Sequence, residues 1–141
     1  MRAVLDTNVV ASAMLWGGQP RLLLDAARAG SLMLCTSAAL LAELADILSR
    51  RKFERKLAAA CRSPDQLVAG YAALATAYRP APVPRIAPDP DDDVVIGTAL
   101  AARAPLIVTG DRALLSVGEY ADIKLLTVSA ALVLLSSHLP G

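Results

Sequence analysis

The sequence is poor in the residues on which several common catalytic sites depend. It has one histidine, His138, and two isolated cysteines, Cys35 and Cys61, among 141 residues. A Ser-His-Asp triad or a histidine-rich zinc site therefore lacks its parts. Cysteines without Cys-x-x-Cys spacing indicate neither a zinc knuckle nor a disulfide framework, and we expect both thiols to be buried as small apolar groups. Any chemistry must then be carried by carboxylates.

Long apolar runs and an excess of either charge are also missing. No stretch offers about 18 cleanly apolar residues for a membrane-spanning helix, and the chain reaches Asp6 too early for a signal peptide. The protein is therefore expected to be cytoplasmic, with no membrane partner. Fourteen Lys and Arg against 13 Asp and Glu give a net charge of +1. This balance excludes a generic polyanion binder, so any charge signal must be local.

What the sequence does contain is a high apolar content, 55%, organised in short segments that alternate with helical patterns. The whole chain, 1–141, is expected to form one domain with its own core. Strands are predicted at 2–5, 31–35, 106–109 and 124–128, with a further brief strand at 83–86. Helices are predicted at 9–16, 20–29, 37–49, 50–62, 64–78, 90–103 and from 129 onward. This order predicts an α/β protein of three layers, α/β/α, around a central parallel sheet of four to five strands.

Acidic residues gather where such a fold would place a ligand. Asp6 and Asp111 each fall just beyond a predicted strand, and ligands of parallel sheets lie beyond the carboxyl ends of the strands. Residues 89–93 add four carboxylates in five positions, with Asp89 as the expected N-cap of a helix and Pro90 as its first residue. The helix dipole favours acids there. Four adjacent carboxylates nevertheless repel one another, and a bound cation would relieve that repulsion.

Helical spacing ranks the acids. Asp92 shares a stripe with the apolar Val95 and Ile96, whereas Asp93 points about 100° away. Asp92 is therefore the first candidate ligand and Asp93 the alternative. Glu43, in the mid-chain helix, lies on the edge of an apolar stripe and is expected to be half-buried, although such a glutamate alone is more often a surface residue.

Four acids without a histidine suit hard, oxygen-seeking cations such as Mg²⁺ or Mn²⁺ better than zinc. The candidate ligands are Asp6, Glu43, Asp92 and Asp111. A pair of such ions about 4 Å apart can activate a water molecule and stabilise the leaving oxygen in an in-line displacement at phosphorus. The pattern favours metal-dependent hydrolysis of a phosphodiester.

The same residues carry a resemblance to a known family. Asp6-Thr7-Asn8 follows the first strand, Glu43 lies in a mid-chain helix, Asp92 precedes a buried helix, and Thr109-Gly110-Asp111 is followed by Leu114-Leu115. In their order and spacing, over residues 1–135, these motifs resemble a PIN domain, specifically the toxin branch of toxin–antitoxin systems related to VapC-type ribonucleases.

The resemblance implies an endoribonuclease that depends on Mg²⁺ or Mn²⁺ and acts on an RNA substrate. It implies that Asp6, Glu43, Asp92 and Asp111 hold the metal, with Asn8 as a polar group behind them. It also implies a homodimer and a cognate protein antitoxin as partner. Separately, the hydroxyls of Thr7 and Thr109 are placed to orient carboxylates, although a threonine at a strand end is at least as often only a β-branched filler.

Basic residues concentrate in one short segment. Six of the 14 lie between residues 50 and 62, and the candidate RNA contacts are Arg50, Arg51, Lys52, Arg55 and Lys56. Such a segment can bind a phosphate backbone, or it can be a solvated helical face that Glu54 partly neutralises. Phe53 is the one ring inside it, so we expect little base stacking.

Two other functions stay open from the sequence. A catalytically silent module would keep the acids as structure or as a surface that docks RNA or protein. An aspartyl-phosphate phosphatase would use Asp6 as its nucleophile. The residue two positions further on is Asn8, which cannot serve as the acid–base partner of such an enzyme.

Overall fold

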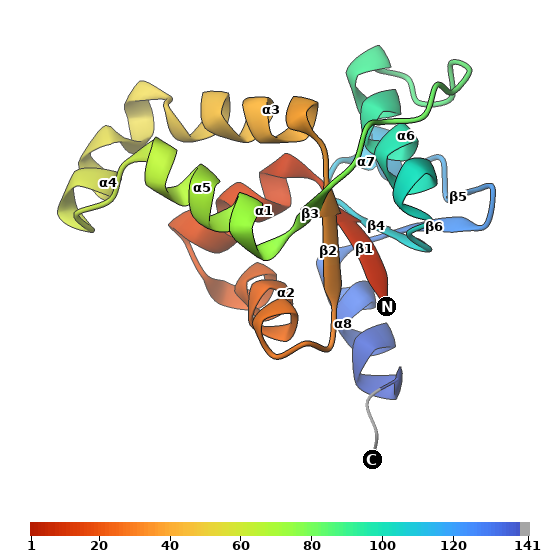
Figure 1. Ribbon diagram of the computed structural model, residues 1–141, viewed down its shortest axis with the longest axis horizontal. Coiled ribbons are helices and arrows are strands. Elements are labelled where there is room, and N and C mark those ends of the chain that lie inside the picture. The colour runs from red at the N-terminus through yellow and green to blue at the C-terminus, as the bar shows by residue number, and fades with distance from the viewer. Residues whose placement is uncertain (139–141) are drawn as a thin grey trace.

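The computed structural model describes residues 1–138, in which helices surround one six-stranded sheet (Figure 1). The strands are β1 (Arg2–Leu5), β2 (Met33–Thr36), β3 (Thr76–Ala77), β4 (Leu106–Val108), β5 (Glu119–Tyr120) and β6 (Ile123–Leu126). The α-helices are α1 (Thr7–Leu15), α2 (Gly18–Arg28), α3 (Ala38–Leu48), α4 (Glu54–Ala59), α5 (Pro64–Leu74), α6 (Asp93–Ala102), α7 (Arg112–Leu115) and α8 (Val128–His138). Two 3₁₀ turns, η1 (Arg51–Phe53) and η2 (Pro90–Asp92), lead into α4 and α6.

The strands follow the order β3-β2-β1-β4-β6-β5. β1 lies in the middle and pairs in parallel with both β2 and β4, so that Val4 stands opposite Cys35 on one side and Ile107 on the other. The chain builds β2 and β3 on one side of β1, and then β4 and β6 on the other. The carboxyl ends of β1 and β4 therefore meet where the strand order reverses, which is where open α/β sheets place their ligands.

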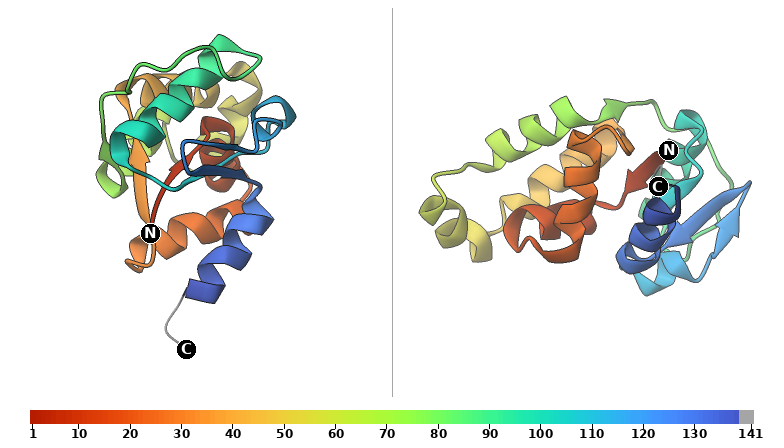
Figure 2. Two further views of the ribbon diagram at one scale, coloured as in Figure 1. Left: turned by 90° about the vertical axis from the view of Figure 1, so that its right-hand side faces the viewer. Right: turned by 90° about the horizontal axis from the view of Figure 1, so that it is seen from below.

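The side chains of the central strands alternate between two cores. Leu5 and Val108 belong to the core formed with α1, α2, α3, α5 and α8, whereas Val4 and Ile107 face the core formed with α6. The views in Figure 2 show helices on both sides of the sheet. This arrangement confirms the three-layer α/β/α fold, because only strands buried on both faces need apolar side chains in both directions.

The edges of the sheet differ from expectation. It has six strands instead of four to five, since β3 and β5 are two-residue edge strands too short to show a sequence pattern. β5 pairs antiparallel with β6. The strand predicted at 83–86 does not form, because Pro82 and Pro84 lack the N–H groups that a ladder needs. The helix predicted to reach Tyr78 ends at Leu74, and the chain then extends beside β2.

Two of the helices, α3 and α5, start at the predicted caps, whereas α1 begins at Thr7, two residues before the expected start, and α8 begins at Val128, one residue before it. The Ser37 side chain accepts from the Leu40 N–H at the start of α3, and Ser63 and Gln66 form a reciprocal capping box at the start of α5. No helix within residues 1–138 is long and apolar enough to cross a membrane. One expectation about the thiols is wrong: Cys35 is buried, but Cys61 is exposed and adopts a φ of 54° just beyond α4.

The proline-rich connector between β3 and η2 is anchored on α6. Asp93 Oδ1 accepts from the N–H groups of Ile86 (3.2 Å) and Ala87 (2.8 Å), and the Ala81 N–H donates to the Gly97 carbonyl at 2.9 Å. A Cβ atom on Gly97 would collide with the backbone carbonyl of Ala81. Glycine at position 97 thus lets the connector approach the helix closely.

We predict that Gly97→Ala destabilises the protein by about 1–3 kcal/mol, because a backbone carbonyl cannot move aside as a flexible side chain can. Urea unfolding followed by circular dichroism measures the change. Gly70→Ala is the matched control, since Gly70 lies in α5 with open space around its Cβ position. Alanine there should be neutral or stabilise by up to about 1 kcal/mol through its helix propensity. Equal stabilities for the two variants would contradict the proposed close approach.

Candidate active site

Asp6 is held at the carboxyl end of β1 by its neighbours on β4. The residue is 4% exposed, and its N–H donates to the Val108 carbonyl at 2.9 Å. Its Oδ2 accepts a 2.7 Å hydrogen bond from the Thr109 hydroxyl. The same hydroxyl oxygen accepts from the Asp111 N–H at 3.0 Å. Thr109 therefore joins a buried carboxylate to the loop that carries a second one.

Asp111 is the N-cap of α7. Its Oδ1 accepts from the Ala113 N–H at 2.9 Å, which satisfies one free donor of the helix start. The residue is half-buried. The cap fixes the direction of the carboxylate, which also lies within hydrogen-bonding reach of the Asp92 side chain.

Asp92 faces the same space from the other side. It ends the 3₁₀ turn η2 and is half-buried. Burial, followed by the charges of Asp111, Asp6 and Asp89, raises the pKa of the Asp92 carboxyl to about 7. Such repulsion requires that the carboxylates lie near one another. Three acids, one just after β1, one at the end of η2 and one in the loop after β4, thus share one edge of the sheet.

Asp93 is turned away from these acids. It is 8% exposed, and besides the two connector N–H groups it pairs with Arg85, whose Nε lies 3.4 Å from Oδ2. The helical wheel placed Asp92 on the packed face, yet Asp93 is the more buried of the two. The reason is that α6 begins only at Asp93 and Asp92 belongs to a 3₁₀ turn, in which the angle per residue differs. With its oxygens engaged by the connector, Asp93 is the weaker candidate for a metal ligand.

Glu43 approaches from α3. It is exposed, where a half-buried position was expected, and its Oε1 accepts a 2.9 Å hydrogen bond from the Thr7 hydroxyl. Thr7 is buried directly beside Asp6. A single threonine therefore connects the glutamate to the acid edge, while the next residue, Asn8, is exposed on α1.

A family model described as PIN domain matches residues 2–113, well over half of the chain. The chain belongs to the PIN domain family. No curated protein and no solved structure matches it. The matched span contains all four predicted acids and ends just past Asp111. The fold is thus of a nuclease type whose members generally hydrolyse with the help of a divalent metal.

The carboxylates of this PIN domain are suitable ligands for such a metal, but they do not form a preorganised metal site. Within residues 1–138, no three His, Cys, Asp or Glu side chains already form a group that would hold a metal ion. In the same span, the Tyr71 hydroxyl is the one buried side-chain polar atom without a partner. A hard cation that entered this edge would find carboxylate oxygens from Asp6, Asp92 and Asp111 and would relieve the repulsion between them.

The basic segment of the PIN domain lies far from the acid edge. All five predicted RNA contacts are exposed, on η1, α4 and the residue before them. They follow α3, whose 11 residues span about 16 Å. Figure 1 shows α4 at one end of the molecule and α6 and α7 at the other. The structure does not bring the bases and the acids into contact.

An aromatic residue that sequence reasoning missed lies beside this segment. Trp16, at the end of α1, is 65% exposed and packs edge-on against Phe53 with ring centroids 6.5 Å apart. Lys56 Nζ lies 4.2 Å from the Trp16 ring centroid, and Lys52 Nζ lies 5.0 Å from that of Phe53. Phe53 is still the one ring within residues 50–62, but the tertiary fold brings a second ring beside it from a distant part of the sequence. The signal in the sequence was a lone tryptophan followed by Gly17-Gly18.

We predict that Asp92→Asn stabilises the metal-free protein at pH 8 by about 1 kcal/mol after allowance for solvent screening. The folded-state pKa of Asp92 is raised to about 7, so the wild type loses stability as the pH rises from about 4 to about 7, while the amide variant does not. Thermal unfolding in EDTA across this pH range measures the difference.

Asp91→Asn is the matched control, because Asp91 is exposed in the same turn and should give no comparable pH-dependent gain. A gain for Asp92→Asn that is the same at pH 4 and pH 8 would contradict the raised pKa of Asp92.

Proposed function

We propose that this PIN domain, acting as one unit over residues 1–141, is an endoribonuclease that depends on Mg²⁺ or Mn²⁺. The observation that carries the proposal is the convergence of Asp6, Asp92 and Asp111 at the point where the strand order reverses. Thr109 fixes the Asp6 carboxylate, the start of α7 fixes that of Asp111, and burial together with the charges of these acids raises the pKa of the Asp92 carboxyl. Carboxylates in this arrangement need a bound cation for catalysis, and such cations support phosphodiester hydrolysis.

Each acid has a distinct part in the proposed site. Asp6, Asp92 and Asp111 would bind the metal, and Glu43 would complete the set from the rim. A metal held by these residues would supply an activated water and neutralise charge on the phosphate. The hydroxyls of Thr109 and Thr7 donate to Asp6 and Glu43, which restricts the rotation of both carboxylates. Asn8 stands exposed beside them, where its amide can contact the substrate.

The RNA would extend from the acid edge toward the basic segment. Arg50, Arg51, Lys52, Arg55 and Lys56 provide cations for phosphates. Trp16 offers an exposed ring on which an unpaired base can stack. Because the basic segment and the acid edge lie at opposite ends of the molecule, several linked nucleotides are needed to reach both places, which favours a polynucleotide substrate over a mononucleotide.

The wider role that we propose is that of a toxin held by a cognate protein antitoxin, as the resemblance of the motifs implies. A homodimer is proposed with it. Leu22 on α2 and Val133 on α8 are 51% and 68% exposed on helices that contact each other, and exposed apolar side chains on adjoining helices are suited to a protein interface.

Asp6→Asn should lower RNA cleavage about 100-fold or more without unfolding the protein, because the amide keeps the acceptor for Thr109 but loses the charge that binds the metal. Single-turnover cleavage of a labelled RNA under Mn²⁺ titration measures the rate. EDTA should abolish the wild-type reaction. If the variant cuts RNA as fast as the wild type, the site is wrong; if the wild type shows no metal binding by calorimetry, the protein is a silent binding module.

Glu43→Gln should weaken Mn²⁺ binding about tenfold while keeping its hydrogen bond with Thr7. Asp46→Asn is the control, since Asp46 is also an exposed acid on α3, almost one turn further along. Isothermal titration with Mn²⁺ compares the two variants. Equal affinities would remove Glu43 from the ligand set and leave the other three acids.

Replacing Arg51 and Arg55 with Gln should weaken RNA binding and reduce the slope of log K against log salt by about 1.4, because each phosphate of a single strand that a cation neutralises adds about 0.7 to that slope. Fluorescence anisotropy with the Asp6→Asn background, which does not cut the RNA, measures binding across a series of salt concentrations. Lys124→Gln, an exposed cation on β6, should leave the slope unchanged. An unaltered slope in the double variant would show that the basic segment is only a solvated face.

A further inference from the structure

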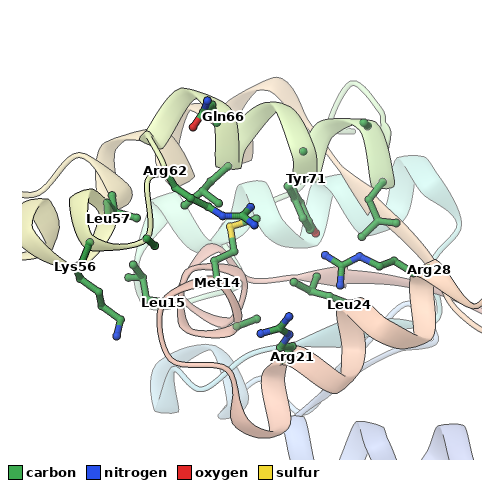
Figure 3. Close-up of a pocket in the computed structure, with 17 residues that line it drawn as sticks. Met14, Leu15, Arg21, Leu24, Arg28, Lys56, Leu57, Arg62, Gln66 and Tyr71 are labelled. Carbon is green, nitrogen blue, oxygen red and sulfur yellow. The ribbon is translucent and has the colours of Figure 1, made fainter.

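A cavity of about 790 Å³ opens on the helical side of the protein, between α1, α2, α4 and α5 (Figure 3). Its volume lies within the range of about 300–1,000 Å³ that is usual for small-molecule sites. Met14, Leu24, Leu57 and Leu67 form much of its wall. The acids proposed for the nuclease site do not line it, and α1 separates the two places: Met14 stands seven residues, or about 10 Å, along the helix from Thr7.

The charged residues around this cavity all have the same sign. Arg21, Arg28, Lys56 and Arg62 line it, and none of its lining residues is acidic. Arg28 pairs with Asp25 at 3.2 Å, and Lys56 lies over the Trp16 ring. Arg21 and Arg62 have no ion pair within the described chain. A cavity with unneutralised guanidinium groups at its rim attracts anions.

The wall of the cavity also contains a polar atom that lacks a partner. Tyr71 is 3% exposed, and its hydroxyl makes no hydrogen bond within the described residues. Figure 3 shows its side chain projecting from α5 into the space toward α2. Burial raises the pKa of the Tyr71 hydroxyl, which therefore stays protonated and can donate. A buried hydroxyl without a partner is rare in proteins, and a ligand that accepts from it would complete it.

The polar groups of the cavity require acceptors. Arginine and lysine only donate hydrogen bonds, and Gln66 Oε1 already accepts from the Ser63 N–H at 3.0 Å. A peptide segment would bring N–H donors for which these side chains offer few acceptors. A phosphate or carboxylate brings acceptors alone, and an attached apolar body would fill the space beside the leucine side chains.

We propose that this cavity is a second binding site, for a small organic anion that joins a phosphate or carboxylate group to an apolar body. The anionic group lies between Arg21 and Arg62 and accepts from the Tyr71 hydroxyl, and the apolar part contacts Met14 and Leu24. The site goes beyond the nuclease function and does not depend on it.

The test uses the full chain in EDTA, so that the acid edge carries no metal, with 1-naphthyl phosphate as the probe. Inorganic phosphate and 1-naphthol are the two comparison ligands. Isothermal titration and thermal shift should show saturable binding of the aryl phosphate, about tenfold tighter than binding of either fragment, because only the intact probe uses both the cations and the apolar wall.

Two variants test the residues. Tyr71→Phe and Arg62→Gln should each weaken binding of the aryl phosphate about tenfold. Tyr71→Phe should also leave the ligand-free protein as stable as the wild type or more stable, because it removes a hydroxyl that has no partner within residues 1–138, and this separates a binding role from a folding role. Lys124→Gln, on the far strand β6, and Asp92→Asn should bind as the wild type does.

Three results would overturn the proposal. The first is an absence of saturable binding to the wild type. The second is unchanged affinity in both Tyr71→Phe and Arg62→Gln. The third is loss of ligand binding at protein concentrations at which analytical ultracentrifugation shows a dimer. That result would assign the cavity to a second copy of the chain.

Discussion

The hydroxyl of Thr109 is the group on which the acid edge depends. It donates to Asp6 and accepts from the backbone of Asp111, and it can do both only because β1 and β4 pair directly with Leu5 opposite Val108. Two carboxylates that would otherwise diverge are thereby kept at neighbouring strand ends. The register of one parallel strand pair fixes their separation, and any shift of that register would move the two acids apart.

Much of this architecture could be predicted from the sequence, because the central strands are short apolar runs and each is followed by its own polar signal. Asp6 and Asp111 were placed at one edge on that basis alone. The order of the strands was not predictable, because the sequence of residues 2–5 does not indicate which strands will pair with this one. The two-residue strands β3 and β5 were missed because their pairing is imposed by β2 and β6 rather than by propensity.

The site was predictable in its members but not in its geometry. Periodicity could not show that a 3₁₀ turn ends at Asp92 and gives Asp93 to the connector. It could not show that Thr7 reaches Glu43 across 36 residues, or that Trp16 meets Phe53. These are tertiary contacts, and the local sequence around either residue gives no indication of its partner. The near-neutral net charge also conceals a division, with carboxylates at the strand ends and cations around α4 and the cavity.

The adjacent acids Asp92 and Asp93 have different roles although their side chains are chemically identical. Asp92 faces the other carboxylates, whereas Asp93 accepts hydrogen bonds from two backbone N–H groups of the connector. The number of acids in this segment therefore does not determine its function. What matters is the position of each acid relative to the first residue of α6. A deletion of one residue from 89–92 would barely alter composition or charge, yet it would move a different residue into the position that faces Asp6. Alignments of this segment between related chains are meaningful only when the first turn of α6 is used as the reference point.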